Sequence, residues 1–128
     1  MTELVKRQLT FWLIDSDHEW MDRCDFVYSS RDPFAVHFRL PGKTWVFCRD
    51  LLAEGLTLPA GDGDVYIEPV SAKDVDITLS SPSGEATLRF DLNDLLDALD
   101  ATWQVVERDK EHIDFDAELA LLLKGHVK

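Results

Sequence analysis

The sequence has few positive charges for its length. Thirteen Lys and Arg residues stand against 25 Asp and Glu residues, for a formal net charge of −12, and the cations are scattered along the chain. A phosphate backbone is attracted by clustered cations and repelled by net negative charge. The composition therefore disfavours nucleic-acid binding and favours a protein partner.

Long apolar runs are also missing. No stretch approaches the roughly 20 apolar residues of a membrane-spanning helix. The start, MTELVKRQLTF, has neither the apolar core nor the small-residue cleavage site of a signal peptide. We therefore expect a cytoplasmic protein without membrane insertion. With 128 residues and 45% hydrophobic content, residues 1–128 are expected to form one domain.

Cysteine is scarce, and the patterns of catalytic chemistry are absent. Cys24 and Cys48 lack CxxC spacing and lie in strand-like runs, where we expect reduced, buried thiols. The four histidines are dispersed, and no HExxH, GxSxG, GxGxxG or P-loop pattern occurs. Asp62 and Asp64 stand two residues apart, as in calcium loops, but the required downstream glutamate is missing. We expect no enzyme, no metal and no cofactor.

Alternating apolar and polar residues predict about seven strands. They cover residues 6–14, 20–28, 34–40, 44–48, 65–68, 75–80 and 86–90. The links between most of them are short and rich in Gly, Pro, Ser and Asp, which is typical of antiparallel neighbours. The predicted fold class is α+β: a mostly antiparallel curled sheet or β-barrel with C-terminal helices.

Two of the links carry further predictions. Asp50 is expected to be the N-cap of a short helix over Leu51–Glu54, which Gly55 would end in the left-handed conformation. Residues 59–64, PAGDGD, are expected to be a loop.

The hydrophobic period changes to 3.6 at Asp91, which predicts a long helix. Its buried face would carry Leu92, Leu95, Leu96, Leu99 and Trp103. A row of aspartates, at 91, 94, 97 and 100, would lie on its solvent side. A second, leucine-rich helix is predicted over 116–124, with enough apolar residues to pack against protein on two sides.

Five residues are candidates for a partner or subunit interface: Trp12, Asp62, Asp64, Asp94 and Leu122. Trp12 should lie on the strand face opposite the core, where large aromatic side chains often anchor interfaces. The three aspartates would steer encounter with a partner. Leu122 represents the apolar surface of the last helix. Trp45 and Trp103, in contrast, fit core positions.

Four motifs follow one another in the centre of the chain. They are an Asp-Pro-aromatic-Ala-Val strand, a TWxFx[RK][DE]LL arm and helix, a GL step and a GDGDVxIxP loop and strand. The residues that form them are Asp32, Pro33, Phe34, Ala35, Val36, Thr44, Trp45, Phe47, Arg49, Asp50, Leu51, Leu52, Gly55, Leu56, Gly61, Asp62, Gly63, Asp64, Val65, Ile67 and Pro69. In this order they resemble the SsgA-like family of actinobacterial sporulation and cell-division proteins.

The resemblance implies a function that composition alone does not. It implies a non-enzymatic homotrimer with a Whirly-like fold, recruited to the division septum. There it would act as an adaptor that helps to localise or organise the tubulin-like GTPase FtsZ, with FtsZ or a sibling SsgA-like protein as partner. The alternative that follows from the Whirly-like fold is a single-stranded nucleic-acid-binding module, which would need exposed aromatics beside a basic groove.

Overall fold

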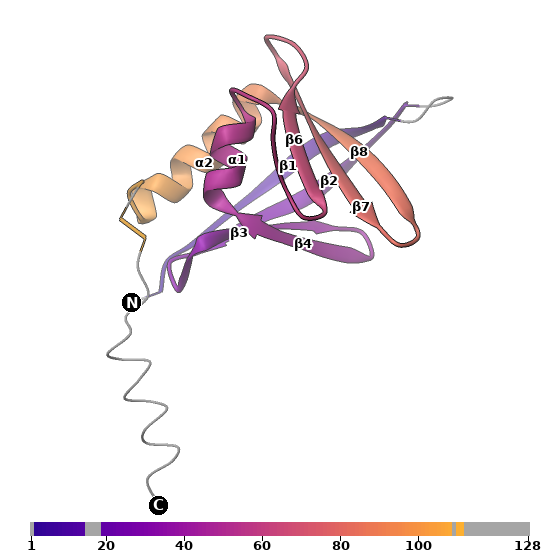
Figure 1. Cartoon of the computed structure of the whole chain (residues 1–128). Coiled ribbons are helices and arrows are strands. Elements are labelled where there is room, and N and C mark those ends of the chain that lie inside the picture. Colours follow the sequence, from indigo (N-terminus) through magenta and orange to yellow (C-terminus); the bar gives the residue numbers. More distant parts are fainter. Residues whose placement is uncertain (1, 15–18, 109, 112–128) are drawn as a thin grey trace, which may run out of the picture.

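An eight-stranded antiparallel sheet, in the order β4-β3-β2-β1-β8-β7-β6-β5, curls around the core of the protein (Figure 1). The computed structural model describes residues 2–14, 19–108 and 110–111. The elements are β1 (Leu4–Ile14), β2 (Glu19–Ser29), β3 (Asp32–Leu40), β4 (Lys43–Cys48), α1 (Arg49–Gly55), β5 (Ala60–Asp62), β6 (Val65–Pro69), β7 (Asp74–Ser81), β8 (Gly84–Asp91) and α2 (Leu92–Val105). None of these helices is long and apolar enough to cross a membrane.

Strand alternation builds the core, as predicted. One face of each long strand is buried, and Phe38 stands at the centre of an aromatic cluster. Its ring centroid lies 5.4 Å from that of Phe26, 5.2 Å from that of Phe47 and 5.7 Å from that of Phe90. Edge-to-face and offset contacts of this kind stabilise a core beyond simple area burial. Phe34, predicted on the same face of β3, is instead exposed.

Helix α1 holds the two ends of the sheet together. It contacts β3 and β4 at one end of the strand order and β5 and β6 at the other. Its own residues Leu51 and Leu52 are buried in the core. Because one short helix packs on both ends, the sheet curls around it into an open barrel shape, with α1 and α2 on the inner side (Figure 1).

Gly55 ends α1 as predicted, but the left-handed conformation predicted for it was wrong. Gly55 is the last residue of α1 and does not adopt a positive φ; the glycines that do are Gly42, Gly63 and Gly84. A Cβ at position 55 would instead overlap the side chain of Ile67 on β6. Glycine is therefore needed here because the helix backbone approaches the strand closely.

Two further expectations in this region are corrected. The N-cap of α1 is Cys48, with no side-chain capping bond, so the helix begins before Asp50. Ala60–Asp62, expected within a loop, is a strand that pairs with Val65–Ile67 and raises the number of strands to eight. Gly63, at φ 58°, makes the tight turn that allows this pairing.

Helix α2 begins as its sequence predicts. The Asp91 carboxylate is the N-cap and accepts hydrogen bonds from the backbone N–H groups of Asn93 (2.8 Å) and Asp94 (3.3 Å). Leu95 and Leu99 are fully buried, and the other predicted members of the apolar face are partly buried. The predicted helix over 116–124 lies outside the described residues.

A buried arginine connects the two helices. Arg49, the first residue of α1, is 1% exposed and donates to the carbonyl oxygens of Thr102 (3.2 Å) and Val106 (2.7 Å) at the end of α2. Its second terminal nitrogen lies 2.5 Å from the carboxylate of Glu111. The guanidinium carbon stands 5.1 Å from the centre of the Tyr28 ring. Carbonyls, carboxylate and ring face thus replace the water that a buried cation loses.

Gly55→Ala is expected to destabilise the protein by about 1–3 kcal/mol, because the added methyl group overpacks the contact with Ile67. In an open helix the same change would stabilise by about 0.5–1 kcal/mol. Urea unfolding followed by tryptophan fluorescence measures the difference. Glu54→Ala, at the exposed neighbouring helix position, serves as control and should have little effect. A higher urea midpoint for Gly55→Ala would contradict the close approach.

Arg49→Met is expected to cost about 3–5 kcal/mol, the usual loss when one partner of a buried ion pair is removed. Arg31→Met changes an exposed arginine in the β2–β3 turn and should stay within about 0.5 kcal/mol of wild type. A double-mutant cycle with Glu111→Leu should show coupling of at least about 0.5 kcal/mol. Additive losses in that cycle would mean that the two side chains do not act as a pair.

Candidate protein-binding surface

The outer face of the sheet carries an exposed tryptophan near the end of the β1–β2 hairpin. Trp12 is 45% exposed, on the opposite strand face from the buried Phe11, as predicted. It pairs in register with Met21 on β2 and with Arg89 on β8. Side chains directly opposite on antiparallel strands lie on the same face. Trp12, Met21 and the nearby Ile14 therefore form one apolar surface, which we call the Trp12 patch.

A fixed ion pair borders this patch. Arg89 donates to both carboxylate oxygens of Asp76 on β7, at 2.7 and 3.0 Å. Such bidentate geometry holds the guanidinium in one orientation. Trp12, Ile14, Asp74 and Arg89 line a shallow hollow of about 200 Å³ beside it. An exposed aromatic next to a rigid, polar rim is the arrangement found at the centre of many protein interfaces.

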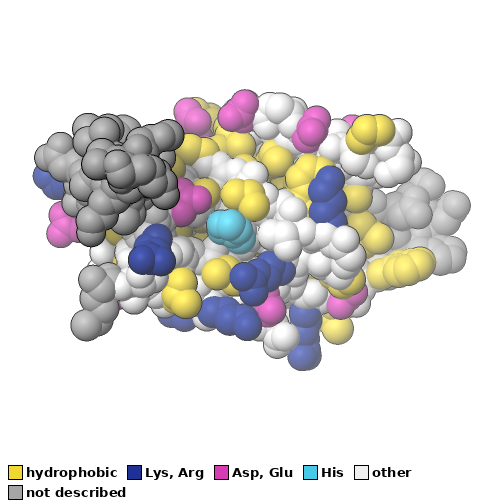
Figure 2. All heavy atoms as spheres, turned by 90° about the horizontal axis from the view of Figure 1, so that it is seen from below, with side chains coloured by type: hydrophobic (Ala, Val, Ile, Leu, Met, Phe, Trp, Pro, Cys, Tyr) yellow, Lys and Arg dark blue, Asp and Glu magenta, His cyan; other side chains and the backbone are white. Residues whose placement is uncertain are grey.

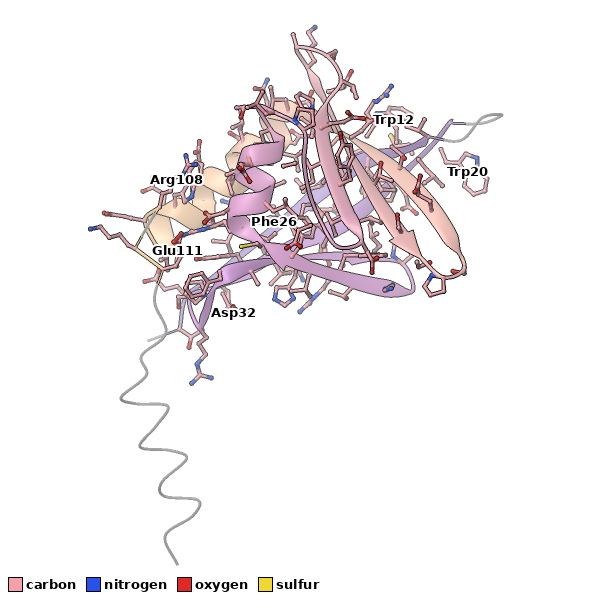
Figure 3. All side chains as sticks on the ribbon, viewed as in Figure 1. Trp12, Trp20, Phe26, Asp32, Arg108 and Glu111 are labelled. Carbon is pink, nitrogen blue, oxygen red and sulfur yellow. The ribbon has the colours of Figure 1, made fainter. Side chains whose placement is uncertain are left out.

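The same hairpin end exposes apolar groups on its other face as well. Trp20 is 60% exposed and Met21 58% exposed, although they are consecutive residues that point to opposite sides of β2. Figure 3 shows Trp12 and Trp20 at the same end of the molecule, far from Glu111. Monomeric proteins seldom expose large apolar groups this densely unless a partner covers them.

The five predicted interface residues do not form one surface. Trp12 lies on β1, whereas Asp62 and Asp64 flank the turn between β5 and β6, with β8 and β7 between them and β1. Asp94 is in the first turn of α2, on the helical side of the sheet. Leu122 lies outside the described residues. The structure thus separates the aspartates from the tryptophan that they were expected to surround.

Asp94 has an environment of its own. Partial burial, followed by the nearby negative charges of Asp91 and Asp97, raises the pKa of its carboxyl group above the ordinary value. Arg7 lines the same small cleft between β1 and α2. The aspartate row is exposed to solvent, as predicted, and has a cation of the same chain beside it.

The cations are spread along the chain, as predicted, whereas the acidic residues are concentrated in its second part. Residues 1–48 carry six of the 13 Lys and Arg and seven of the 25 Asp and Glu, whereas residues 49–128 carry seven and 18. Lys6, Arg23 and Arg39 lie at outward-facing register positions of β1, β2 and β3. Figure 2 shows Lys and Arg side chains gathered around a histidine on this face. Strand pairing places Arg39 opposite Asp25 and diagonally across from Arg23, whereas Lys6 lies on the other side of Asp25.

The described part of the chain offers hollows but no set of metal ligands. No group of three or more His, Cys, Asp or Glu side chains within it could hold a metal ion. The hollow of about 290 Å³ at the mouth of the curled sheet is lined by residues such as Leu40, Trp45 and Leu79, together with serines. These groups offer apolar contact and weak hydrogen bonding.

The two cysteines occupy different environments. Cys24 is buried, and desolvation, with added repulsion from Asp25 and Asp22, raises its thiol pKa to about 12. Cys48 is exposed on the outer face at the end of β4, so the expectation that both thiols are buried was wrong. Both are free thiols in the structure.

Sequence reasoning missed several residues of this surface. Met21 stands at a position of β2 whose side chain points away from the core, so the alternation of apolar and polar residues could have identified it. Arg23 and Arg39 become neighbours only through the pairing of β2 with β3, in which Asp25 stands opposite Arg39. No sequence signal predicts that register, because it depends on where each turn falls.

Fold and surface define a small sheet protein whose exposed apolar residues suit protein contact. The chain matches the family described as "Streptomyces sporulation and cell division protein, SsgA" over residues 23–111. The chain belongs to this family. Among its relatives are the sporulation-specific cell division proteins SsgB of Saccharopolyspora erythraea, 44% identical over 73% of this chain and 72% of the relative, and of Streptomyces coelicolor, 42% identical over 75% and 77%.

Solved structures show the same fold. An SsgB structure, from work relating SsgB mutations to longitudinal cell division during sporulation of Streptomyces coelicolor, matches with a TM-score of 0.80 at 37% identity, covering 88% of this chain and 95% of that one. The SsgA-like sporulation-specific cell division protein of Thermobifida fusca matches with a TM-score of 0.81 at 31% identity, covering 92% and 94%. The predicted curled sheet and family are thereby confirmed, whereas the Whirly-like relationship stays a prediction.

Proposed function

We propose that this protein is a non-enzymatic regulator of cell division during sporulation, acting as an oligomeric adaptor at the division septum. Its relatives are named sporulation-specific cell division proteins, which supports the general role. The adaptor role is more specific than the names of the relatives, and it rests on the exposed residues of the outer sheet face. The observation that carries it is the Trp12 patch, an exposed tryptophan and methionine fixed on a rigid sheet.

The proposed partner is FtsZ or a sibling SsgA-like protein, which this protein would bind in the cytoplasm and at the septum. Mutations in the Streptomyces coelicolor SsgB correlate with longitudinal cell division during sporulation. A protein that influences division without chemistry of its own has to act by binding. The proposed homotrimer follows from the family resemblance, and apolar surface on the chain is compatible with subunit contacts.

The alternative, single-stranded nucleic-acid binding, needs aromatic side chains beside a basic groove. The outer face of β1–β3 carries an anion beside its cations: the Asp25 carboxylate lies 3.9 Å from the Lys6 ammonium group, so this face is mixed in sign. The exposed aromatic residue that could stack on a base is Trp12, and it borders the Arg89–Asp76 ion pair. With a net charge of −12, this arrangement favours a protein partner over a phosphate backbone.

Trp12→Ala is expected to weaken binding to the partner by about 30-fold, the loss typical of an aromatic anchor worth about 2 kcal/mol. Titration of the variant against FtsZ and against a sibling SsgA-like protein at moderate salt measures this change. Tyr66→Ala removes a similarly exposed aromatic from the same sheet face on β6 and is the matched control. Equal affinities for both variants would contradict the role of the Trp12 patch.

The same titration with labelled single-stranded DNA and RNA separates the two functions. We expect no submicromolar binding to either nucleic acid. Light scattering on the wild-type protein should give the mass of three chains. Tight, salt-sensitive nucleic-acid binding without any protein partner would overturn the adaptor proposal.

A further inference from the structure

The hollow beside Trp12 has the size of a site for one side chain. Trp12, Ile14, Asp74 and Arg89 line it, and its volume is about 200 Å³. Pockets that enclose whole small molecules measure roughly 300–1,000 Å³. The hollow therefore suits a side chain of a partner protein whose neighbouring residues contact the Trp12 patch.

The outer face of β6, β7 and β8 is strongly acidic. Residues 65–91, which form these strands and the turns between them, carry five acidic side chains against two basic ones, Lys73 and Arg89. Strand pairing places all five at outward positions, on the same face as Trp12: Glu68, Asp74, Asp76, Glu85 and Asp91. The hollow lies at the border of this acidic face, so an acidic side chain is disfavoured there.

Arg89 does not reverse this preference, although it lines the hollow. Its guanidinium donates to both oxygens of the Asp76 carboxylate, at 2.7 and 3.0 Å. Glu68 stands opposite Asp76 on β6, so carboxylates outnumber the cation along this row of the sheet. An incoming carboxylate would have to compete with Asp76 for a positive charge that is already neutralised.

Asp74 is the acidic side chain that an incoming cation would meet. It has no ion-pair partner among the described residues, and one of its carboxylate oxygens accepts a hydrogen bond from the Ser71 hydroxyl at 3.2 Å. In the sheet it stands directly opposite Asp91, and like charges at such positions are destabilising. A cation beside Asp74 would relieve this repulsion. An apolar side chain would instead remove the carboxylate from water without compensation.

We propose that the hollow beside Trp12 binds an arginine side chain of the partner protein, with its plane against the Trp12 ring and its charge toward Asp74. Arginine combines these requirements, because its planar cation stacks on aromatic rings and pairs with carboxylates. This inference rests on the proposed role as a protein adaptor and adds which side chain the partner contributes. It concerns that one side chain and not the net charge of the partner.

The probe is a blocked pentapeptide with one arginine between two pairs of glycines, titrated against the full-length protein. Two control peptides replace the arginine by citrulline, which has nearly the same shape without the charge, and by glutamate. Binding is followed by the NMR signal of the Trp12 indole N–H, which a Trp12→Phe variant assigns. We expect the arginine peptide to shift this signal and to bind at least fivefold more tightly than either control.

Asp74→Asn should weaken binding of the arginine peptide at least threefold. Its thermal midpoint should equal or exceed that of wild type, because one of two facing carboxylates is removed. Asp64→Asn changes the net charge equally in the exposed turn between β5 and β6 and should change the affinity less than twofold. Trp12→Leu, which keeps an apolar group without the aromatic ring, should also lose at least threefold, and Tyr66→Leu is its control.

Equal binding of the arginine and citrulline peptides would overturn the proposal, as would an unchanged affinity of Asp74→Asn. Equal losses in Asp74→Asn and Asp64→Asn would indicate attraction by net charge alone and would overturn it too. Loss of partner binding on Trp12→Ala, with no response of the Trp12 signal to the arginine peptide, would keep the adaptor role and reject the arginine site. Selective binding of the arginine peptide without binding to FtsZ or a sibling would support the site and reject the adaptor role.

Discussion

The buried guanidinium of Arg49 is the interaction on which the arrangement of the helices depends. Removing a cation from water costs several kcal/mol, and this cost is offset only where partners surround it. Here two carbonyls at the end of α2, the Glu111 carboxylate and the Tyr28 ring do so. Arg49 is the first residue of α1, and α1 contacts both ends of the sheet. The Arg49 guanidinium therefore fixes the positions of α2, the two sheet ends and the described segment after α2 relative to one another.

A sheet closed in this way is well packed at one end and open at the other. The two helices lie toward one end, while the β1–β2 hairpin extends at the other end past Asp25 and Arg39, where the pairing of β2 with β3 stops (Figure 1). Regions with few packed neighbours open at lower free energy than the core. The chain therefore combines a rigid body with an end whose backbone and apolar side chains remain available, which is the division of roles that an adaptor requires.

The strands were predictable because burial on one face imposes a period of two. Phe26, Phe38 and Phe90 follow this period in the sequence. Ala60–Asp62 lacks that signal, since its pairing comes from the turn at Gly63 and not from a buried face. Gly55 shows a different limit. A glycine at the end of a helix fits a left-handed cap equally well, and only the position of Ile67 reveals that space was the constraint. No sequence pattern marked Arg49 as buried, because the residues that accept its hydrogen bonds lie more than 50 positions away. Trp12 was found from the alternation of β1 alone, whereas the point at which β2 stops pairing with β3 depends on where β3 ends.

Charge decides how salt acts on the binding of an acidic partner to this acidic chain. Over distances beyond the Debye length, about 8 Å at physiological ionic strength, the net charge of −12 is largely screened. Within contact distance a partner on the outer face of β1–β3 meets Lys6, Arg23 and Arg39 together with Asp25, and the attraction of these cations is screened less. Salt should therefore act in two opposite ways on such a partner. At low ionic strength the repulsion of the whole chain slows association, and moderate salt relieves it; at high ionic strength the local attraction weakens and dissociation accelerates. A maximum of affinity at intermediate salt would distinguish this surface from a nucleic-acid site, where affinity falls steadily as salt rises.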